Sequence, residues 1–291
     1  MPTEPITRLA PAKLNLALHV TGRRPDGYHL IESLVAFADF GDEITVAHAD
    51  EDKFVVSGHF ASWVPIDGSN LVLAARDLVR KLLPGTNTPP VRIMLNKRLP
   101  VASGVGGGSS DAAATIKALL ALWGAQIDAE ELARAAVSLG ADLPMCLAER
   151  PLIARGIGDE IEPLRSFPAV HAVLVNPGAQ ISTPEIFKAL EKRDNAPLPK
   201  WTEANDTFAV AQSLANMRND LQQAAMALCP AIADVLDALR SNGAELARMS
   251  GSGATCFGLF DNFGPAVAAA DVISKMQPGW FVEPCLIRGT D

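Results

Sequence analysis

The chain has 291 residues, of which 48% are apolar and 20% are charged. This composition supplies enough apolar side chains for a sizeable core, excludes a disordered chain and, at ~150 residues per domain, predicts about two domains. The 25 basic and 33 acidic side chains give a formal net charge of −8, so the protein has no basic field that would attract nucleic acid. An anionic ligand would have to be held by local groups.

The short apolar runs and the scattered cysteines and histidines further restrict the class of protein. Runs such as residues 118–123 are far below the ~18 needed to span a bilayer, and residues 1–13 lack the apolar centre of a signal peptide. We therefore expect a soluble, cytoplasmic protein with no membrane partner. The cysteines are widely spaced, which indicates buried thiols, and the histidines form neither HxH nor HExxH, so we expect no zinc. A metal, if used, would be a hard cation that arrives with its ligand.

The first third of the chain reads as strands with one helix. Alternating or β-branched segments predict strands over 14–20, 30–39, 43–47, 54–57 and 91–96. Apolar residues at helical spacing predict a helix over 71–82, with Asp67 or Ser69 as its N-cap and Pro84-Gly85 at its end. The helix would lie on the sheet.

Helices dominate from Ser109 onward. A stripe from Ala112 to Trp123 predicts one helix, and Asp128 starts a second that ends at Gly140. Further segments read as strands (152–155, 171–176), helices (184–191, 207–215, 221–228, 231–239) and a final strand, glycine turn, strand, helix, strand over 245–287. Grouped as well as alternating elements predict an α+β fold. A Gly- and Pro-rich stretch predicts domains 1–160 and 161–291.

The strongest local signal is a glycine cluster between a predicted strand and a predicted helix. The segment runs from Pro100 to Ala113, and its candidate anion-binding residues are Gly104, Gly106, Gly107, Gly108, Ser109 and Ser110. Glycines let successive amides turn inward, and a helix N-terminus adds about half a positive charge, so this segment predicts a phosphate site. A tight strand-to-helix turn, the alternative, would need about one glycine rather than four.

Other candidates are ambiguous on spacing alone. The second glycine cluster, with Gly251 and Gly253 between two strands, could bend toward the first cluster or be a hairpin turn. Asp142 stands shortly before a proline, in Asp-Leu-Pro, a pattern that is more typical of a turn than of a catalytic residue. Lys13 interrupts an apolar strand and either faces inward toward an acidic or phosphate partner or is a solvated edge lysine.

One segment combines a turn with cations and aromatic rings. Between Arg23 and His29 stand two arginines, a Pro-Asp-Gly turn, and Tyr28, which is the one tyrosine of the chain. The segment could be a solvent-exposed loop. Alternatively, the rings and cations could hold a planar base that carries phosphates.

The order of these motifs resembles the GHMP small-molecule kinases. The motifs are Pro-Ala-Lys13-Leu-Asn15, Asp-Gly-Tyr28-His29, Gly-Gly-Gly-Ser-Ser-Asp-Ala-Ala, Gly-Ala-Asp142-Leu-Pro and Met-Ser-Gly-Ser-Gly-Ala, and they extend over nearly the whole chain. The segment 21–29 resembles family members whose substrate carries a cytidine diphosphate group. The resemblance implies a ribosomal-protein-like N-terminal domain, an α+β C-terminal domain and an active-site cleft between them.

The resemblance also implies roles for individual residues. ATP, with Mg²⁺ bound to it, would lie on Gly104 to Ser110, and Asp142 paired with Lys13 would act on the acceptor hydroxyl. Pro100 would also contact ATP, and Asn70 and Lys97 are weaker ATP candidates. The substrate would contact Asn15, Tyr28, His29, Thr183, Phe187, Gly251 and Gly253. Asp111 stands where the family frequently has asparagine, and Val105 where it usually has leucine. An additional carboxylate near a triphosphate would weaken binding.

Three other interpretations compete with this one. A homoserine or mevalonate-type kinase would share the glycine motifs but lack a cytidine pocket, which Tyr28 and His29 argue for. A non-catalytic nucleotide-binding module would need neither Lys13 nor Asp142. An RNA-binding protein would show basic patches and interleaved aromatic residues, whereas this chain has a net charge of −8 and 5% aromatic residues.

Overall fold

The computed structural model describes residues 4–290, and their contacts divide the chain into two compact units. The first unit comprises the stretch up to Ala12, Phe40–Val101 and Gly106–Ala148. The second comprises Lys13–Asp39, Ala102–Val105 and the residues from Glu149 onward. Each unit is therefore assembled from separate stretches of sequence. The boundary near residue 160 between two family domains stays a prediction.

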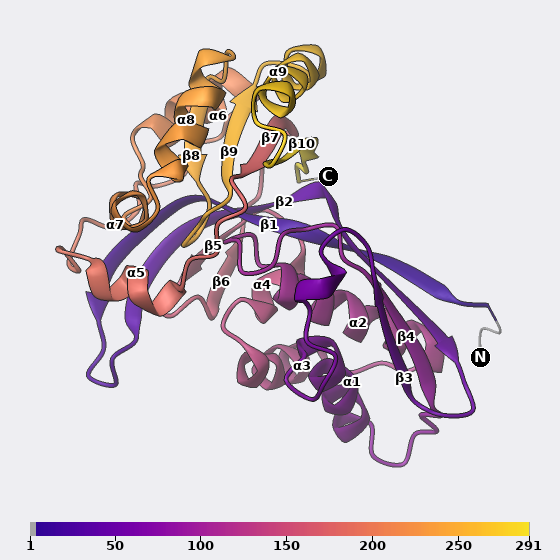
Figure 1. Ribbon diagram of the computed structural model, residues 1–291. Coiled ribbons are helices and arrows are strands. Elements are labelled where there is room, and N and C mark those ends of the chain that lie inside the picture. Colours follow the sequence, from indigo (N-terminus) through magenta and orange to yellow (C-terminus); the bar gives the residue numbers. More distant parts are fainter. Residues whose placement is uncertain (1–3, 291) are drawn as a thin grey trace. The chain divides into compact units, whose positions relative to one another are not determined.

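Two long strands contribute residues to both units (Figure 1). They are β1 (Ile6–Arg23) and β2 (His29–His48), which pair with each other. The prediction of separate strands over 30–39 and 43–47 was wrong, because β2 continues through Gly41. A Cβ at Gly41 would collide with the backbone of Ala10 and Pro11, so the glycine is needed for close strand approach and does not make a turn.

A mixed sheet and two packed helices form the first unit. β4 (Val91–Asn96) runs antiparallel to β2, with register from Glu43↔Asn96 to His48↔Val91, and β3 (Lys53–Ser57) runs parallel to β4. The parallel pair is connected through η1 (Ala61–Trp63) and α1 (Leu71–Leu82), which packs against α2 (Gly107–Trp123). The predicted cap was wrong: Asn70 caps α1 by accepting a bond from the Val72 amide at 2.8 Å.

Short helices complete the first unit. Asp128 caps α3 (Ala129–Ala136), and η2 (Val137–Leu139) ends at Gly140, as predicted. Helix α4 (Leu143–Ala148) follows where the sequence indicated only a turn, and it packs against α2. Asp142 lies immediately before α4.

An antiparallel sheet covered by helices forms the second unit. The strands follow the order β2, β10 (Phe281–Ile287), β7 (Val170–Asn176), β9 (Cys256–Phe260) and β8 (Leu246–Met249), and β5 (Leu152–Arg155) and β6 (Glu160–Pro163) pair beside β2. The helices are α5 (Thr183–Ala189), α6 (Thr207–Ala215), α7 (Gln222–Leu228), α8 (Ala231–Ser241) and α9 (Phe263–Met276). Strand β6, whose residues are mostly exposed, was not predicted from the sequence.

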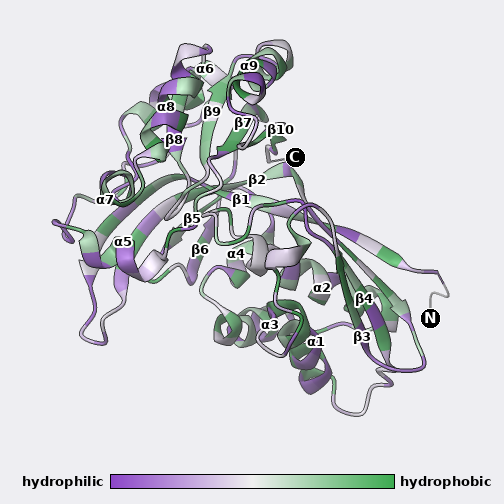
Figure 2. Cartoon of the chain, viewed as in Figure 1, coloured by the Kyte–Doolittle hydropathy of each residue, from purple (hydrophilic) through white to green (hydrophobic). Residues whose placement is uncertain are grey.

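Apolar residues of these strands and helices make the core of the second unit. Figure 2 shows β7 and β9 as hydrophobic, and α8 and α9 pack on them. The predicted α+β class is confirmed. All four cysteines are free thiols, and three of them are buried. Among residues 4–290, no helix is long and apolar enough to cross a membrane.

Candidate functional site

Gly104 of the first glycine cluster lies against the second glycine cluster within the second unit. Gly104 has a φ of +77°, and a Cβ there would lie 2.5 Å from the Ser250 carbonyl oxygen and 2.6 Å from the Gly253 nitrogen. A Cβ on Gly251 would lie 2.8 Å from the Gly104 carbonyl oxygen. Only glycine fits such an approach. The second cluster is a hairpin loop, since Met249 pairs with Cys256, and it also bends toward the first cluster, as one reading of the sequence predicted.

The Ser250 hydroxyl connects this loop to β1. It accepts a hydrogen bond from the backbone amide of Asn15 at 3.0 Å and donates one to the backbone carbonyl of Gly104 at 2.9 Å. The Lys13 amide donates to the Val105 carbonyl at 2.9 Å. Asn15 and Ser250 are thus joined in one hydrogen-bonded cluster, although more than two hundred residues separate them in the sequence.

The start of α2, in the first unit, has the geometry of an anion site. Gly106 precedes α2 with a φ of 64°, and no side chain caps this end of the helix. The amides of the first helical turn have no carbonyl partner within the helix, and the aligned peptide dipoles place partial positive charge there. Ser109 is half-buried, whereas the Ser110 hydroxyl is buried and donates to the Cys146 sulfur at 3.4 Å. Backbone amides, more than the Ser110 hydroxyl, are therefore available to an anion.

The two residues expected to act on the acceptor belong to different units. Lys13 is 4% exposed on β1 in the second unit, so the inward-facing alternative is confirmed over the solvated one. Asp142 is half-buried in the first unit, and its backbone carbonyl accepts the Cys146 amide at the start of α4.

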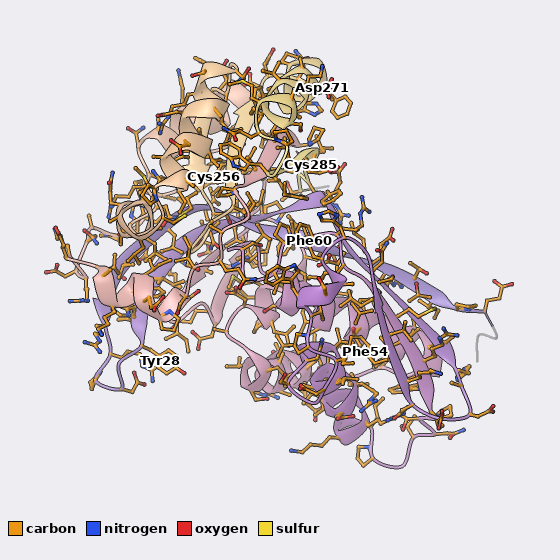
Figure 3. The ribbon with its side chains drawn as sticks, viewed as in Figure 1. Tyr28, Phe54, Phe60, Cys256, Asp271 and Cys285 are labelled. Carbon is orange, nitrogen blue, oxygen red and sulfur yellow. The ribbon has the colours of Figure 1, made fainter. Side chains whose placement is uncertain are left out.

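Of the three rings expected to contact the substrate, two stack on each other and the third is exposed. Phe187 on α5 stacks on His29, with ring centroids 4.7 Å apart and planes inclined by 25°. Tyr28 is 60% exposed on the loop between β1 and β2 (Figure 3). The His29 Nε2 atom is buried without a hydrogen-bond partner. Burial, together with the charges of Arg23 and Arg193, lowers the pKa of His29, so its imidazole is neutral at pH 7.

Two further polar side chains of the second unit border the glycine loop. Asn15 donates to the Ser33 hydroxyl at 2.7 Å, but its Oδ1 atom is buried without a partner. The Thr183 hydroxyl lies 2.7 Å from the Ser252 hydroxyl, which connects α5 to the loop. The unpartnered Asn15 oxygen can accept a hydrogen bond from a ligand.

The weaker nucleotide candidates are engaged within the first unit. Asn70 uses its carbonyl oxygen to cap α1 and its amide to donate to the Pro65 carbonyl at 2.6 Å. The Lys97 ammonium group lies between the carboxylates of Asp42 and Asp111. Pro100 is buried in the segment between β4 and α2.

The residues that support the glycine loop were not predicted from the sequence. The buried Asn219 amide group donates to the Met249 and Gly251 carbonyls, both at 2.8 Å. Arg248 is buried and donates to the carbonyls of Leu16, Leu214 and Met217, each at 2.8 Å. An asparagine just before a helical pattern was a visible signal, but it is also typical of an ordinary cap. In the part of the chain that the structure describes, no three His, Cys, Asp or Glu side chains gather as metal ligands.

Comparison with known proteins identifies the family. The model of the GHMP kinases N terminal domain matches residues 70–150, and the model of the GHMP kinases C terminal domain matches residues 186–279. The chain belongs to the GHMP kinases. This GHMP kinase is 55% identical to the 4-diphosphocytidyl-2-C-methyl-D-erythritol kinase of Mesorhizobium japonicum, over 94% of this chain and 92% of that protein.

Other relatives agree with this family assignment. The enzyme of the same name from Rhizobium meliloti is 52% identical over 98% of this GHMP kinase and 96% of that protein. A solved 4-(cytidine 5'-diphospho)-2C-methyl-D-erythritol kinase is 33% identical with a TM-score of 0.80, covering 98% of this chain and all of that one. The homoserine kinase of Cytophaga hutchinsonii has a TM-score of 0.69 at 18% identity, which shows the shared fold.

Proposed function

We propose that this GHMP kinase transfers the γ-phosphoryl group of ATP to the 2-hydroxyl of 4-diphosphocytidyl-2-C-methyl-D-erythritol. The products are ADP and the corresponding 2-phosphate, and the step belongs to non-mevalonate isoprenoid synthesis in the cytoplasm. The main support is the name shared by relatives that are 52% and 55% identical over nearly the full chain. The Tyr28-His29 segment and the glycine clusters agree with that substrate.

The uncapped start of α2 suits the phosphates of ATP, since amides from Gly107 to Ser109 and the helix dipole favour an anion there. ATP supplies the phosphoryl group, and Mg²⁺ accompanies its phosphates and neutralises part of their charge. Gly104 and Gly106, both with positive φ, shape the backbone before the helix.

Asp142 is proposed to take the proton of the acceptor hydroxyl as its oxygen forms the new bond to phosphorus. The bond between the γ-phosphorus and the β-phosphate oxygen breaks, and ADP leaves with that oxygen. Lys13 is proposed to compensate negative charge at the acceptor. Because phosphoryl transfer leaves little covalent work to the protein, positioning and charge neutralisation are the main contributions.

His29 and Phe187 are proposed to recognise the cytosine ring, assisted by Tyr28. The unpartnered, neutral His29 Nε2 can hydrogen-bond to a base edge, and the aromatic surface of Phe187 can stack on a base. Asn15 and Thr183 are proposed to contact the methylerythritol and diphosphate groups, near Gly251 and Gly253.

The test is ADP release from ATP and Mg²⁺ with the diphosphocytidyl substrate, alongside homoserine and mevalonate. We expect the diphosphocytidyl substrate to give the highest kcat/KM. Faster ADP release with either of the other acceptors would overturn the proposal.

A further inference from the structure

A buried cluster of charges lies in the first unit. The Lys97 Nζ atom is 2.5 Å from an oxygen of Asp42 and 2.9 Å from an oxygen of Asp111. The exposed fractions of the Lys97, Asp42 and Asp111 side chains are 4%, 0% and 5%. One cation thus faces two carboxyl groups with almost no access to water, and a second ionised carboxylate would be uncompensated.

The two carboxyl groups differ in their hydrogen bonds. Asp42 is fully satisfied as a carboxylate, since one of its oxygens accepts the amides of Arg98 and Leu99 at 2.6 and 2.8 Å and the other accepts Lys97. Asp111 has Lys97 on one oxygen, and its Oδ1 is buried without a partner. Burial, reinforced by the negative charge of Asp42 and opposed by Lys97, raises the pKa of Asp111 to about 8.

Among the residues that the structure describes, neither α1 nor α4 supplies a second cation to Asp111. On α1, Arg76 and Arg80 pair with Asp52, Arg76 also pairs with Asp77, and Lys81 is exposed. Helix α4 is built from Leu143 to Ala148 without a charged residue. Lys97 therefore remains the cation to which both Asp42 and Asp111 are bonded.

The cluster lies directly beneath the start of α2. Asp111 is the fifth residue of that helix. A Cβ on Gly107, the first residue, would lie 3.0 Å from Lys97 Nζ and 3.6 Å from an oxygen of Asp42. Any change in the charge of the cluster therefore acts on the helical turn that faces the proposed phosphate site.

We propose that Asp111 is held as a neutral acid and acts as a positioning residue for nucleotide binding. With Asp111 neutral, the cluster has no net charge, Lys97 stays paired with Asp42, and the positive end of α2 is available to phosphates. Loss of the Asp111 proton places a buried negative charge behind the first turn and weakens nucleotide affinity. The effect on affinity rests on the proposed function, whereas the neutral acid does not.

The first experiment compares wild type with Asp111→Asn, which keeps the shape of the side chain and cannot ionise. Binding of a non-hydrolysable Mg²⁺–ATP analogue is measured by calorimetry between pH 6.5 and 9. We expect wild-type affinity to fall relative to Asp111→Asn by about 3- to 10-fold across this range, as expected for one added charge near a phosphate. The control Asp77→Asn removes a carboxylate that is 62% exposed, and it should follow the wild-type curve. Parallel curves for wild type and Asp111→Asn would overturn the proposal.

Two measurements test the neutral acid without nucleotide. The infrared spectrum of the full-length wild-type protein without ligand should contain, at pH 6.5, the carbonyl stretch of a protonated carboxylic acid. This band should be lost by pH 9. In thermal unfolding, the Tm of Asp111→Asn should exceed that of wild type by a margin that widens as pH rises toward 8. The sign follows because a pKa raised in the folded state gives stability that is present below the ordinary pKa and lost as pH rises through about 8.

The outcomes separate this inference from the proposed function. If neither protein binds the nucleotide analogue, the proposed function fails, and the infrared and unfolding results still decide whether Asp111 is neutral. If Asp111→Asn does not fold, the wild-type infrared spectrum alone decides. Absence of the acid band at pH 6.5 would overturn the inference.

Discussion

At the scale of single residues, the absence of a side chain at Gly107 leaves room both for an anion at the start of α2 and for the Lys97 ammonium group. Its backbone belongs to the first turn of α2, whose amides are free for an anion, and its Cα side faces the Lys97 ammonium group. Its φ does not lie in the left-handed region, so a side chain there is opposed by space and not by backbone strain. Substitution at this position therefore tests the site rather than the fold.

We expect Gly107→Val to weaken ATP binding by about tenfold or more while the fold persists, because the new side chain blocks backbone approach and displaces Lys97. Isothermal titration measures the affinity, and circular dichroism checks the fold. The matched control is Gly279→Val, at an exposed glycine where a Cβ would meet nothing within 4 Å. Equal nucleotide affinity in the Gly107→Val variant and wild type would remove the anion site from α2.

Asp142 supports a second prediction at this scale. Asp142→Asn keeps the shape of the side chain but cannot accept the hydroxyl proton, so kcat should fall by a factor of ~10² or more while both ligands still bind. Steady-state kinetics measure kcat, and equilibrium titrations measure the two affinities. The control Asp77→Asn should keep its turnover. An Asp142→Asn variant that retains most of its activity would exclude Asp142 as the base.

At the scale of elements, side-chain hydrogen bonds hold the loop between β8 and β9 to other segments of the second unit. The Asn219 side chain donates hydrogen bonds to two backbone carbonyls at the loop. Arg248, on β8, donates to carbonyls of β1 and of the end of α6. The Ser250 hydroxyl is hydrogen-bonded to the backbones of Asn15 and Gly104. Leaving a buried carbonyl unpaired costs about 1–3 kcal/mol. The conformation of the loop is therefore fixed by these bonds and not by its glycines alone.

We expect Asn219→Asp to lower kcat/KM by about tenfold at pH 8, because a carboxylate would face two carbonyl oxygens that now accept an amide. Protonation of the new acid restores one donor, so activity relative to wild type should recover as pH falls, whereas Asn219→Ala should show no such recovery. Asn216→Asp, at an exposed asparagine nearby, is the control. Identical pH profiles for Asn219→Asp and Asn219→Ala would contradict a positioning role.

Periodicity predicted most elements because their buried faces repeat along the sequence. Helix α6 and strand β4 have the predicted bounds. The failures have physical causes: Gly41 reads as a turn until Ala10 packs against it, and β6 is a short, mostly exposed strand. The candidate anion site could be proposed from the sequence because its residues are contiguous. The Lys97 cluster was not, because its partners lie 55 and 14 positions away and meet only in the folded chain.

At the scale of the whole molecule, stability should respond to pH through groups with opposite shifts. A hydrogen bond from Arg80 lowers the pKa of Asp52 to about 2, so its contribution is present above the ordinary pKa and is lost as pH falls toward 2. Asp111 acts in the other direction, since its raised pKa makes stability decline as pH rises toward 8. The free energy of unfolding should therefore fall both at acidic pH, through Asp52, and toward pH 8, through Asp111.

Choice of substrate is also a property of the whole molecule. If Phe187 stacks on cytosine, stacking should contribute on the order of 1–3 kcal/mol, and the neutral His29 should discriminate base edges through its unpartnered Nε2. Uracil presents a carbonyl where cytosine presents an amino donor, which would leave a buried polar group badly matched. At saturating ATP, we therefore expect CDP to inhibit better than UDP or GDP.

Phe187→Ala should raise the KM for the diphosphocytidyl substrate more than the KM for ATP, because stacking acts on the acceptor. Phe208→Ala is the matched control, since this ring on α6 is 56% exposed. Its two KM values should stay at those of the wild type. Equal inhibition by the three nucleotides, or an unaltered substrate KM in Phe187→Ala, would assign the ring to packing against His29 and would remove the physical basis for a cytidine site.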